Sequence, residues 1–260
     1  MKRYYLLILL LGMFNCLPAE AQISVCVYQK DGTVNFFNNV SRIVCNTEIQ
    51  DIYVDGEKIS SLPVSQVDSV LYDDLKMEDQ KVDLGLSVKW AAWNVGATRP
   101  EEYGNYYYWG DLKAWDGDAF YNYPYYDNEK QEYIFIGDDI SATQYDAARA
   151  EWGDSWRMPT FAEFSELIEK CKWRWIVYNG VEGQQVIGPN GNSIFFPATG
   201  YAQGEYVNAQ KWTGYYWTST LYETKSYFYY AYGMTFNSEN GGRTLYYGRN
   251  YGLSIRPVSN

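Results

Sequence analysis

The sequence predicts an α+β protein in which a small β-rich unit precedes a larger domain of strands and two helices. Three observations lead to this prediction. Apolar and polar residues alternate from Val82 to Trp90, which is typical of a half-buried strand. Apolar residues recur every three or four positions from Phe161 to Cys171, which indicates one face of a helix. Asp-Gly pairs divide short runs in the first third of the chain, which indicates hairpins.

The first 21 residues predict a secretory signal peptide. A basic start at Lys2 and Arg3 precedes an apolar run over residues 4–14, and Ala19-Glu20-Ala21 follows as a cleavage site. The apolar run is shorter than the roughly 20 residues that a membrane-spanning helix needs. We therefore expect a protein that is secreted or held at the cell surface or outer membrane. Lipid attachment at Cys16 stays open as an alternative, although the residues before it are larger than such a site prefers.

Residues 22–76 predict the small β-rich unit. Its turns fall at Asp31-Gly32 and Asp55-Gly56, because these pairs tolerate the positive φ of tight hairpins. A charged stretch over residues 76–81 marks the boundary, so the main domain is expected over 77–260. A disulfide between Cys26 and Cys45 is left open, since an oxidising compartment would permit one.

The main domain has clear start and stop signals. Thr160 and Glu163 have the spacing of a capping box, so the principal helix begins after Thr160, and a shorter helix is expected over about residues 143–152. Cys171 continues the apolar stripe of the principal helix, which indicates core packing rather than reactivity. Strands are expected on both sides of the turn at 189–192 and at the closing "YGLSIRPV". Residues 99–139 read as long loops, which in a compact domain tend to carry function.

Composition excludes several classes of function. The chain has no histidine, so imidazole bases, Ser-His-Asp systems and ordinary histidine-bearing zinc sites are absent. A formal net charge of −11 disfavours a nucleic-acid or anionic-membrane partner, because phosphate contacts need clustered Lys and Arg. A carboxylate glycosidase is the remaining enzyme class, and any chain this acidic satisfies its spacing by chance. We expect no catalytic residue and no cofactor.

Aromatic residues are the unusual feature, at 19% of the chain with 28 tyrosines. In the stretch 214–233, alternation places Tyr230 and Tyr232 on the core side with Met234 and Phe236. Burying a phenol without a partner costs about 1–3 kcal/mol, so many of the other rings are expected to keep their oxygens in water as a contact surface. The expected ligand contacts are Tyr106, Tyr108, Trp109, Trp115, Tyr123, Tyr125, Tyr216, Trp217, Tyr222, Tyr227 and Tyr229.

These features predict an exported, non-catalytic binding or adhesion protein that contacts glycan or protein ligands. A structural subunit of an envelope or extracellular assembly is the alternative. Calcium could assist binding, since it takes six to eight oxygen ligands, although no EF-hand spacing is present. The acidic and amide residues considered for it are Asp116, Asp118, Asp127, Asn128, Asp138 and Asp139.

Five segments resemble the Fibrobacter succinogenes major paralogous domain, which is abundant in exported proteins of Bacteroidetes. They are "VDLGLSVKWAAWNVGATRPEEYGNYYYWGD", "YDAARAEWGDSWRMPTFAEFSELIEKCKW", "GPNGNSIFFPATGY", "YYWTST" and "YGLSIRPV", in this order between Val82 and Val258. The resemblance implies a C-type-lectin-like domain with two helices, twisted antiparallel sheets, neighbouring termini and long loops at one end. It also implies a distant similarity to formylglycine-generating enzymes.

Two departures limit what the resemblance implies. Formylglycine-generating enzymes use a pair of cysteines near the C-terminus, and no cysteine follows Cys171 here, so their catalysis does not carry over. Trp93 stands where many relatives have a cysteine. The C-terminal part also resembles variable proteins diversified by retroelements, which implies ligand contacts in the tail. The matching positions are Tyr222, Glu223, Lys225, Tyr227, Tyr229, Tyr246, Tyr247, Arg249 and Asn250.

Overall fold

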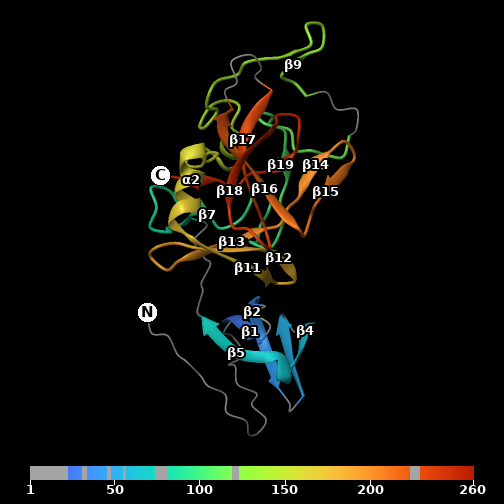
Figure 1. The fold of residues 1–260 in the computed structure, drawn as a ribbon, viewed down its shortest axis with the longest axis vertical. Helices are drawn as coiled ribbons and strands as arrows, with labels where there is room; N and C mark the ends of the chain where they lie inside the picture. Colours follow the sequence, from blue (N-terminus) through green and yellow to red (C-terminus); the bar gives the residue numbers. More distant parts are fainter. Residues whose placement is uncertain are drawn as a thin grey trace. The chain divides into compact units, whose positions relative to one another are not determined.

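The computed structural model describes residues 23–30, 34–45, 48–54, 57–73, 81–118, 123–222 and 229–260 (Figure 1). The expected signal peptide and Cys16 lie outside these ranges. The chain divides into two compact units between residues 78 and 79, and residues 176–181 group with the first unit. This division lies two residues from the boundary expected at 76 and 77.

Residues 23–73 of the first unit form antiparallel strands in the order β5-β1-β2-β3-β4. Its strands are β1 (Ile23–Gln29), β2 (Val34–Cys45), β3 (Ile49–Val54), β4 (Glu57–Pro63) and β5 (Val67–Asp73), with a short 3-10 turn at Val64–Gln66. Its core holds Val25, Val27, Phe37, Val40 and Ile52. The β-rich character predicted for this segment is therefore present.

The strand register bears on the cysteine pair. Cys26 is paired with Phe36 of β2, whereas Cys45 ends that strand and is paired with Gln50. Positions 36 and 45 lie nine residues apart in one strand, which advances about 3.3 Å per residue. The Cα atoms of a disulfide lie within about 7 Å, so this register does not bring the two positions to bridging distance.

The second unit contains several small sheets. A five-stranded sheet has the order β18-β17-β16-β19-β8, and a three-stranded sheet has the order β20-β7-β6. The strands of these two sheets are β6 (Lys81–Val82), β7 (Lys89–Ala91), β8 (Tyr106–Tyr107), β16 (Thr213–Leu221), β17 (Tyr230–Asn237), β18 (Arg243–Gly248), β19 (Leu253–Ser254) and β20 (Val258–Ser259). The remaining strands are β9 (Tyr126–Asp127), β10 (Glu132–Tyr133), β11 (Lys172–Tyr178), β12 (Val181–Ile187), β13 (Ser193–Pro197), β14 (Tyr201–Gln203) and β15 (Tyr206–Asn208).

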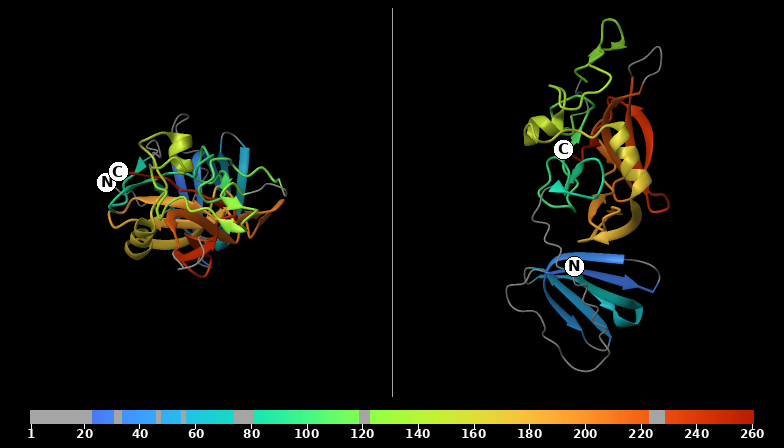
Figure 2. Two further views of the ribbon diagram at one scale, coloured as in Figure 1. Left: turned by 90° about the horizontal axis from the view of Figure 1, so that it is seen from above. Right: turned by 90° about the vertical axis from the view of Figure 1, so that its left-hand side faces the viewer.

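Two short helices accompany these sheets. Helix α1 (Ala147–Trp152) is capped by Asp146, whose side chain accepts from the backbone N–H of Arg149. Helix α2 (Phe161–Lys170) has the predicted capping box, with Thr160 and Glu163 each accepting from the other's backbone N–H. The apolar face of α2 packs on the sheet of β16, β17 and β18, and Figures 1 and 2 show the helix beside these strands.

The α+β, C-type-lectin-like fold class is wrong, because the structure is mostly β with several small sheets. The two predicted helices exist but hold only 6 and 10 residues. The side predicted to be apolar between residues 82 and 90 does face the core, since Leu84, Val88 and Trp90 are buried. This segment does not form one strand, because Gly85 adopts φ of +76° in a turn that Asp83 closes through its side chain. Only β6 and β7 remain at the two ends.

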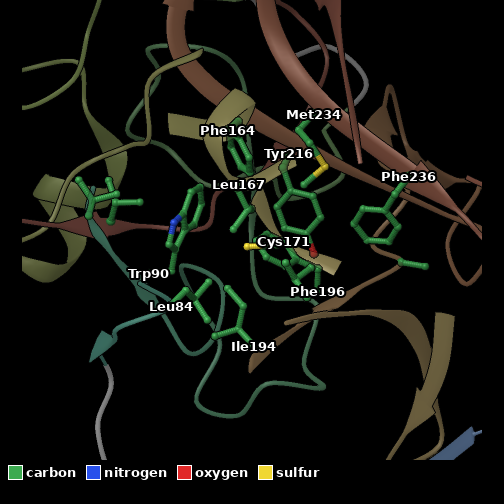
Figure 3. Packing of buried hydrophobic residues seen from close by; sticks show 14 residues of the cluster. Leu84, Trp90, Phe164, Leu167, Cys171, Ile194, Phe196, Tyr216, Met234 and Phe236 are labelled. Carbon is green, nitrogen blue, oxygen red and sulfur yellow. The ribbon is translucent and has the colours of Figure 1, made fainter. Parts of the chain in front are cut away.

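The main core lies between α2 and the surrounding sheets. Trp90, Phe164, Leu167, Phe196 and Tyr216 pack with Met234 and Phe236 (Figure 3). Cys171 is buried in this cluster, and burial raises the pKa of its thiol to about 11. The thiol is therefore unionised at neutral pH, and the burial of Cys171 confirms its predicted place in the core.

Arg256 is a fully buried cation that joins three parts of the second unit. Its guanidinium donates to the side chain of Asn94 and to the carbonyls of Ala91, Ala92 and Phe195. Burial lowers its pKa to about 10, so it stays protonated at neutral pH. The predicted closing strand is divided into β19 and β20, and Arg256 between them is held by one side-chain amide and three backbone carbonyls.

Candidate functional site

Seven of the side chains expected to contact ligand are buried instead. Their positions in the core correct the sequence prediction: Tyr106, Tyr108, Trp109, Tyr123, Tyr216, Trp217 and Arg249 are each exposed by 7% or less. The physical reason is that polar tips find partners inside. Trp109 donates its indole N–H to the carbonyl of Thr218, and Trp217 donates to that of Tyr107. The hydroxyl of Tyr216 donates to the carbonyl of Pro197.

Three further predicted contacts are half-buried and pack on neighbouring rings. Trp115 meets the edge of Tyr106 and donates to the carbonyl of Gly204. Tyr125 lies between the rings of Tyr123 and Tyr145. Tyr247 lies over Gly233, where a Cβ atom would come within 2.9 Å of its ring. These rings brace loops and strands, whereas Tyr227 lies outside the described residues.

The other three predicted residues, Tyr222, Tyr229 and Tyr246, come together on the surface of the second unit. They join Tyr133, Tyr230 and Tyr232 in a continuous line of six rings, which we call the tyrosine ridge. All six are at least partly exposed, and Tyr246 keeps 48% of its surface in solvent. The ridge unites the loop around β10 with the strands β16, β17 and β18.

Ring geometry along the ridge is close and mostly edge-on. Tyr232 contacts Tyr222 with ring centroids 5.0 Å apart, and Tyr222 stacks on Tyr246 at 4.2 Å and 18°. Tyr246 meets Tyr230 at 5.1 Å. Tyr230 meets Tyr229 at 4.3 Å, and Tyr229 meets Tyr133 at 4.9 Å. Each such contact contributes about 0.5–1.5 kcal/mol beyond area burial, so the rings hold one another in place.

Arg249 fixes one end of the ridge from beneath. Its Nε donates to the hydroxyl of Tyr123 at 2.9 Å and its Nη1 donates to the carbonyl of Ile134 at 3.0 Å. Its guanidinium carbon also lies 5.6 Å from the ring centroid of Tyr133. Arg249 is fully buried, so its role is to hold the projecting segment of β9 and β10 seen in Figures 1 and 2.

Burial raises the pKa of Tyr133 and of Tyr229 above that of free tyrosine. Both phenols therefore remain neutral across the physiological pH range. The hydroxyl of a neutral phenol can donate as well as accept, which suits contact with a carbonyl, an amide or another hydroxyl.

Two ridge residues, Tyr230 and Tyr232, were missed because the sequence pattern places them in the core. Tyr230 and Tyr232 were assigned to the core with Met234 and Phe236, and only the latter two are buried. Helix α2 covers this face of β17 but starts at Phe161, whose ring is 4.3 Å from that of Tyr232. The two tyrosines lie at and beyond the helix start. Sequence periodicity alone does not show where a covering helix begins.

The positions that resemble a diversified tail differ in their exposure to solvent. Tyr246 is exposed, whereas Tyr247 is half-buried and Arg249 is fully buried. Glu223 and Lys225 lie outside the described residues. Arg249 holds structure, so it is unsuited to unrestricted variation.

Three of the acidic residues considered for calcium have other local partners. Asp116 pairs with Lys113 at 3.0 Å, and Asp127 pairs with Lys130 at 3.2 Å. Asp139 accepts from the backbone N–H of Ser141 and so closes a turn. Within the described ranges, no three His, Cys, Asp or Glu side chains gather as a metal site.

The two most exposed large apolar side chains of the described chain were not predicted at all. Tyr206 is 69% exposed and Trp212 is 75% exposed, in and just after the β14–β15 hairpin. The signal was the turn chemistry of Gly204-Glu205 between short apolar runs, which identifies a hairpin but not the side that faces solvent.

Comparison with known proteins gives one partial match. The sequence model of the family described as "Domain of unknown function (DUF8237)" matches residues 180–258, which include β12 to β19 and most of the tyrosine ridge. No curated protein matches the chain. No solved structure matches it. Among the residues that the structure describes, no helix is long and apolar enough to cross a membrane.

Proposed function

We propose that this is an exported, non-catalytic binding protein whose tyrosine ridge contacts a protein ligand. The observation that carries the proposal is the ridge itself, six mutually packed and partly exposed phenol rings on a rigid support. Tyrosine offers a large contact area at low entropic cost together with a polar tip, and it is enriched at interaction surfaces for this reason.

Ring packing favours a protein over a glycan at the ridge. A sugar stacks on the free face of an aromatic ring, whereas one face of Tyr246 is already occupied by Tyr222. In the edge-on contacts along the rest of the line, the edge of one ring lies against the face of its neighbour, so further ring faces are covered. These features suit the side chains and backbone groups of a protein surface, where aromatic anchors dominate the binding energy.

Export and surface attachment belong to the same proposal. They are supported by the signal-like residues 1–21 and by the resemblance of five segments to an exported domain of Bacteroidetes. The absence of catalysis is supported by the lack of histidine and by the buried, unionised state of Cys171.

The test begins with protein and glycan arrays probed with residues 22–260. Each captured ligand is then titrated against the parent, Tyr246→Ala and Tyr230→Ala by biolayer interferometry. We expect each ridge variant to bind a protein ligand about tenfold more weakly, the loss of about 1.4 kcal/mol that an aromatic anchor commonly supplies. The matched control is Ile59→Ala, an exposed apolar residue of the first unit.

Three outcomes would contradict the proposal. Parental affinity in both ridge variants for every captured ligand would remove the ridge from the binding surface. If the arrays captured only glycans, and the ridge variants bound them more weakly, the ligand of the ridge would be a glycan and not a protein. Concentration-dependent oligomers without any captured ligand would favour a structural subunit.

A further inference from the structure

We propose a second binding site on the β14–β15 hairpin, which takes an uncharged polysaccharide chain. The site is the face formed by Tyr201, Gln203, Tyr206 and Asn208, called the hairpin face, with Trp212 in the turn that follows. It shares no residue with the tyrosine ridge, and it does not depend on what the ridge binds.

Strand register places these four side chains together. Tyr201 is paired with Asn208, and Gln203 is paired with Tyr206. Residues directly opposite in an antiparallel pair share a face, with Cβ atoms about 4.5–5.5 Å apart. Residues two apart on one strand also point to the same face. Each tyrosine therefore has an amide side chain opposite it on the partner strand, and the two tyrosine–amide pairs lie next to each other. Ala202 points to the other side and is fully buried.

The polar groups of this face are available to a ligand. Gln203, Tyr206, Asn208 and Trp212 make no side-chain hydrogen bond to the described part of the chain. Two amides, a phenol and an indole N–H thus remain beside aromatic rings, of which Tyr206 and Trp212 are the most exposed. Tyr201 is half-buried and extends the face toward the rings of Tyr215 and Tyr251.

The hairpin is held firmly, so its rings are displayed in a fixed arrangement. At its turn, Gly204 adopts φ of +59° and its carbonyl accepts from the indole of Trp115. Ala202 exchanges two backbone hydrogen bonds with Gly252 at 2.7 and 2.9 Å. Before Trp212, Ala209 and Lys211 take positive φ values of 56° and 72°, a conformation that non-glycine residues adopt only when their surroundings impose it.

The chemistry of the face fits a polysaccharide. A pyranose ring has an apolar C–H face that stacks on an aromatic ring and a rim of hydroxyls that an amide can both donate to and accept from. Rings and amides recur along the face as sugar units recur along a chain. The core of a protein interface instead needs a contiguous apolar patch, which this alternation interrupts. The formal net charge of −11 disfavours acidic polysaccharides.

The experiment is affinity electrophoresis of residues 22–260 in native gels that contain β-glucan, xylan, mannan or starch, with polygalacturonate as the charged comparison. Oligosaccharides from any retarding polysaccharide are then titrated by calorimetry. We expect Tyr206→Ala and Trp212→Ala each to weaken binding about tenfold, and Gln203→Ala to weaken it less. Phe135→Ala is the matched control, since that ring is 49% exposed and lies outside both proposed sites.

Folding is checked by melting temperature, which these exposed substitutions should leave unchanged. Retardation of the parent by a neutral polysaccharide, lost in Tyr206→Ala and Trp212→Ala but kept in Phe135→Ala, supports the site. Four results overturn it. They are no retardation in any neutral gel, equal retardation of all variants, stronger retardation by polygalacturonate, and a parent protein that is a dimer which Trp212→Ala abolishes, since Trp212 would then be a contact between two copies. None of these results changes the expected effect of Tyr246→Ala on a protein ligand, so the two proposals fail separately.

Discussion

Replacing Arg249 by methionine should release the segment that carries β9 and β10 and shorten the tyrosine ridge. The guanidinium of Arg249 donates to the hydroxyl of Tyr123 and to the carbonyl of Ile134. It also lies 4.9 Å from the ring centroid of Trp109 and 5.4 Å from that of Tyr123. Methionine keeps the unbranched shape of the side chain but removes every one of these interactions.

The expected cost follows from these contacts. Hydrogen bonds from a charged donor contribute about 1.5–3 kcal/mol each, and a desolvated cation–π contact contributes up to about 2 kcal/mol. Relief of the desolvation of the buried guanidinium offsets part of this sum. Loss of the guanidinium leaves the Tyr123 hydroxyl and the Ile134 carbonyl without this donor, at about 1–3 kcal/mol each, and with the lost cation–π contacts we expect a total of about 3–5 kcal/mol. For a unit of this size, the melting temperature should fall by about 10 °C.

Thermal unfolding by near-ultraviolet circular dichroism and hydrogen exchange by mass spectrometry provide the assay. Peptides over residues 123–136 should exchange faster in Arg249→Met, while those over α2 change less. Arg243→Met on the exposed edge of β18 is the matched control and should shift stability by less than about 0.5 kcal/mol. If Arg249→Met melts with the parent and keeps its protection over residues 123–136, the anchoring role of Arg249 is wrong.

Three further perturbations test the fold around the two proposed sites. Burial alone would raise the pKa of Glu163, but hydrogen bonds from Arg157 and from the Thr160 N–H hold this pKa below its usual range. The ionised carboxylate therefore stabilises the fold above about pH 4.5, and this stabilisation is lost as pH falls through the pKa of the folded state. Glu163→Gln should therefore cost about 2–4 kcal/mol in urea unfolding at pH 7 and much less at pH 3; an equal cost at both would contradict the charge argument. Gly214→Ala should lower stability by about 1–3 kcal/mol, because its Cβ would come within 2.1 Å of the Phe236 ring; a parental melting temperature would show that the ring moves freely. Burial raises the pKa of Tyr106 to about 12, so stability should stay level up to pH 10 and fall between pH 10 and 12; phenolate absorbance that rises in one step near pH 10 with no loss of structure would oppose this.

Local signals in the sequence predicted several elements well. The capping box at Thr160 and Glu163, the turn at 189–192 and the burial of Cys171 all rest on neighbouring residues, and the structure confirms them. The predicted fold class was wrong because it depends on residues that are far apart in the sequence. Many of the strands have only two or three residues, and pairs that short depend on partners far away in the chain, as β7 depends on β20.

The candidate site was only partly predictable. Tyr222, Tyr229 and Tyr246 were correctly expected to be accessible, but Trp109, Tyr123 and Trp217 were not expected to be buried. A tyrosine or tryptophan can satisfy its polar tip with a distant backbone carbonyl, as Trp109 does with Thr218. Composition reports how many such groups exist, whereas tertiary structure decides which of them find an interior partner.

The three-stranded sheet of β6, β7 and β20 places the first and last strands of the second unit on the two sides of β7, one strand apart. A module whose entry and exit lie one strand apart can be placed within a surface loop of a host, or joined to copies of itself, without stretching its own backbone. The aromatic surfaces would then be multiplied along an array, and several weak contacts would add up to durable attachment.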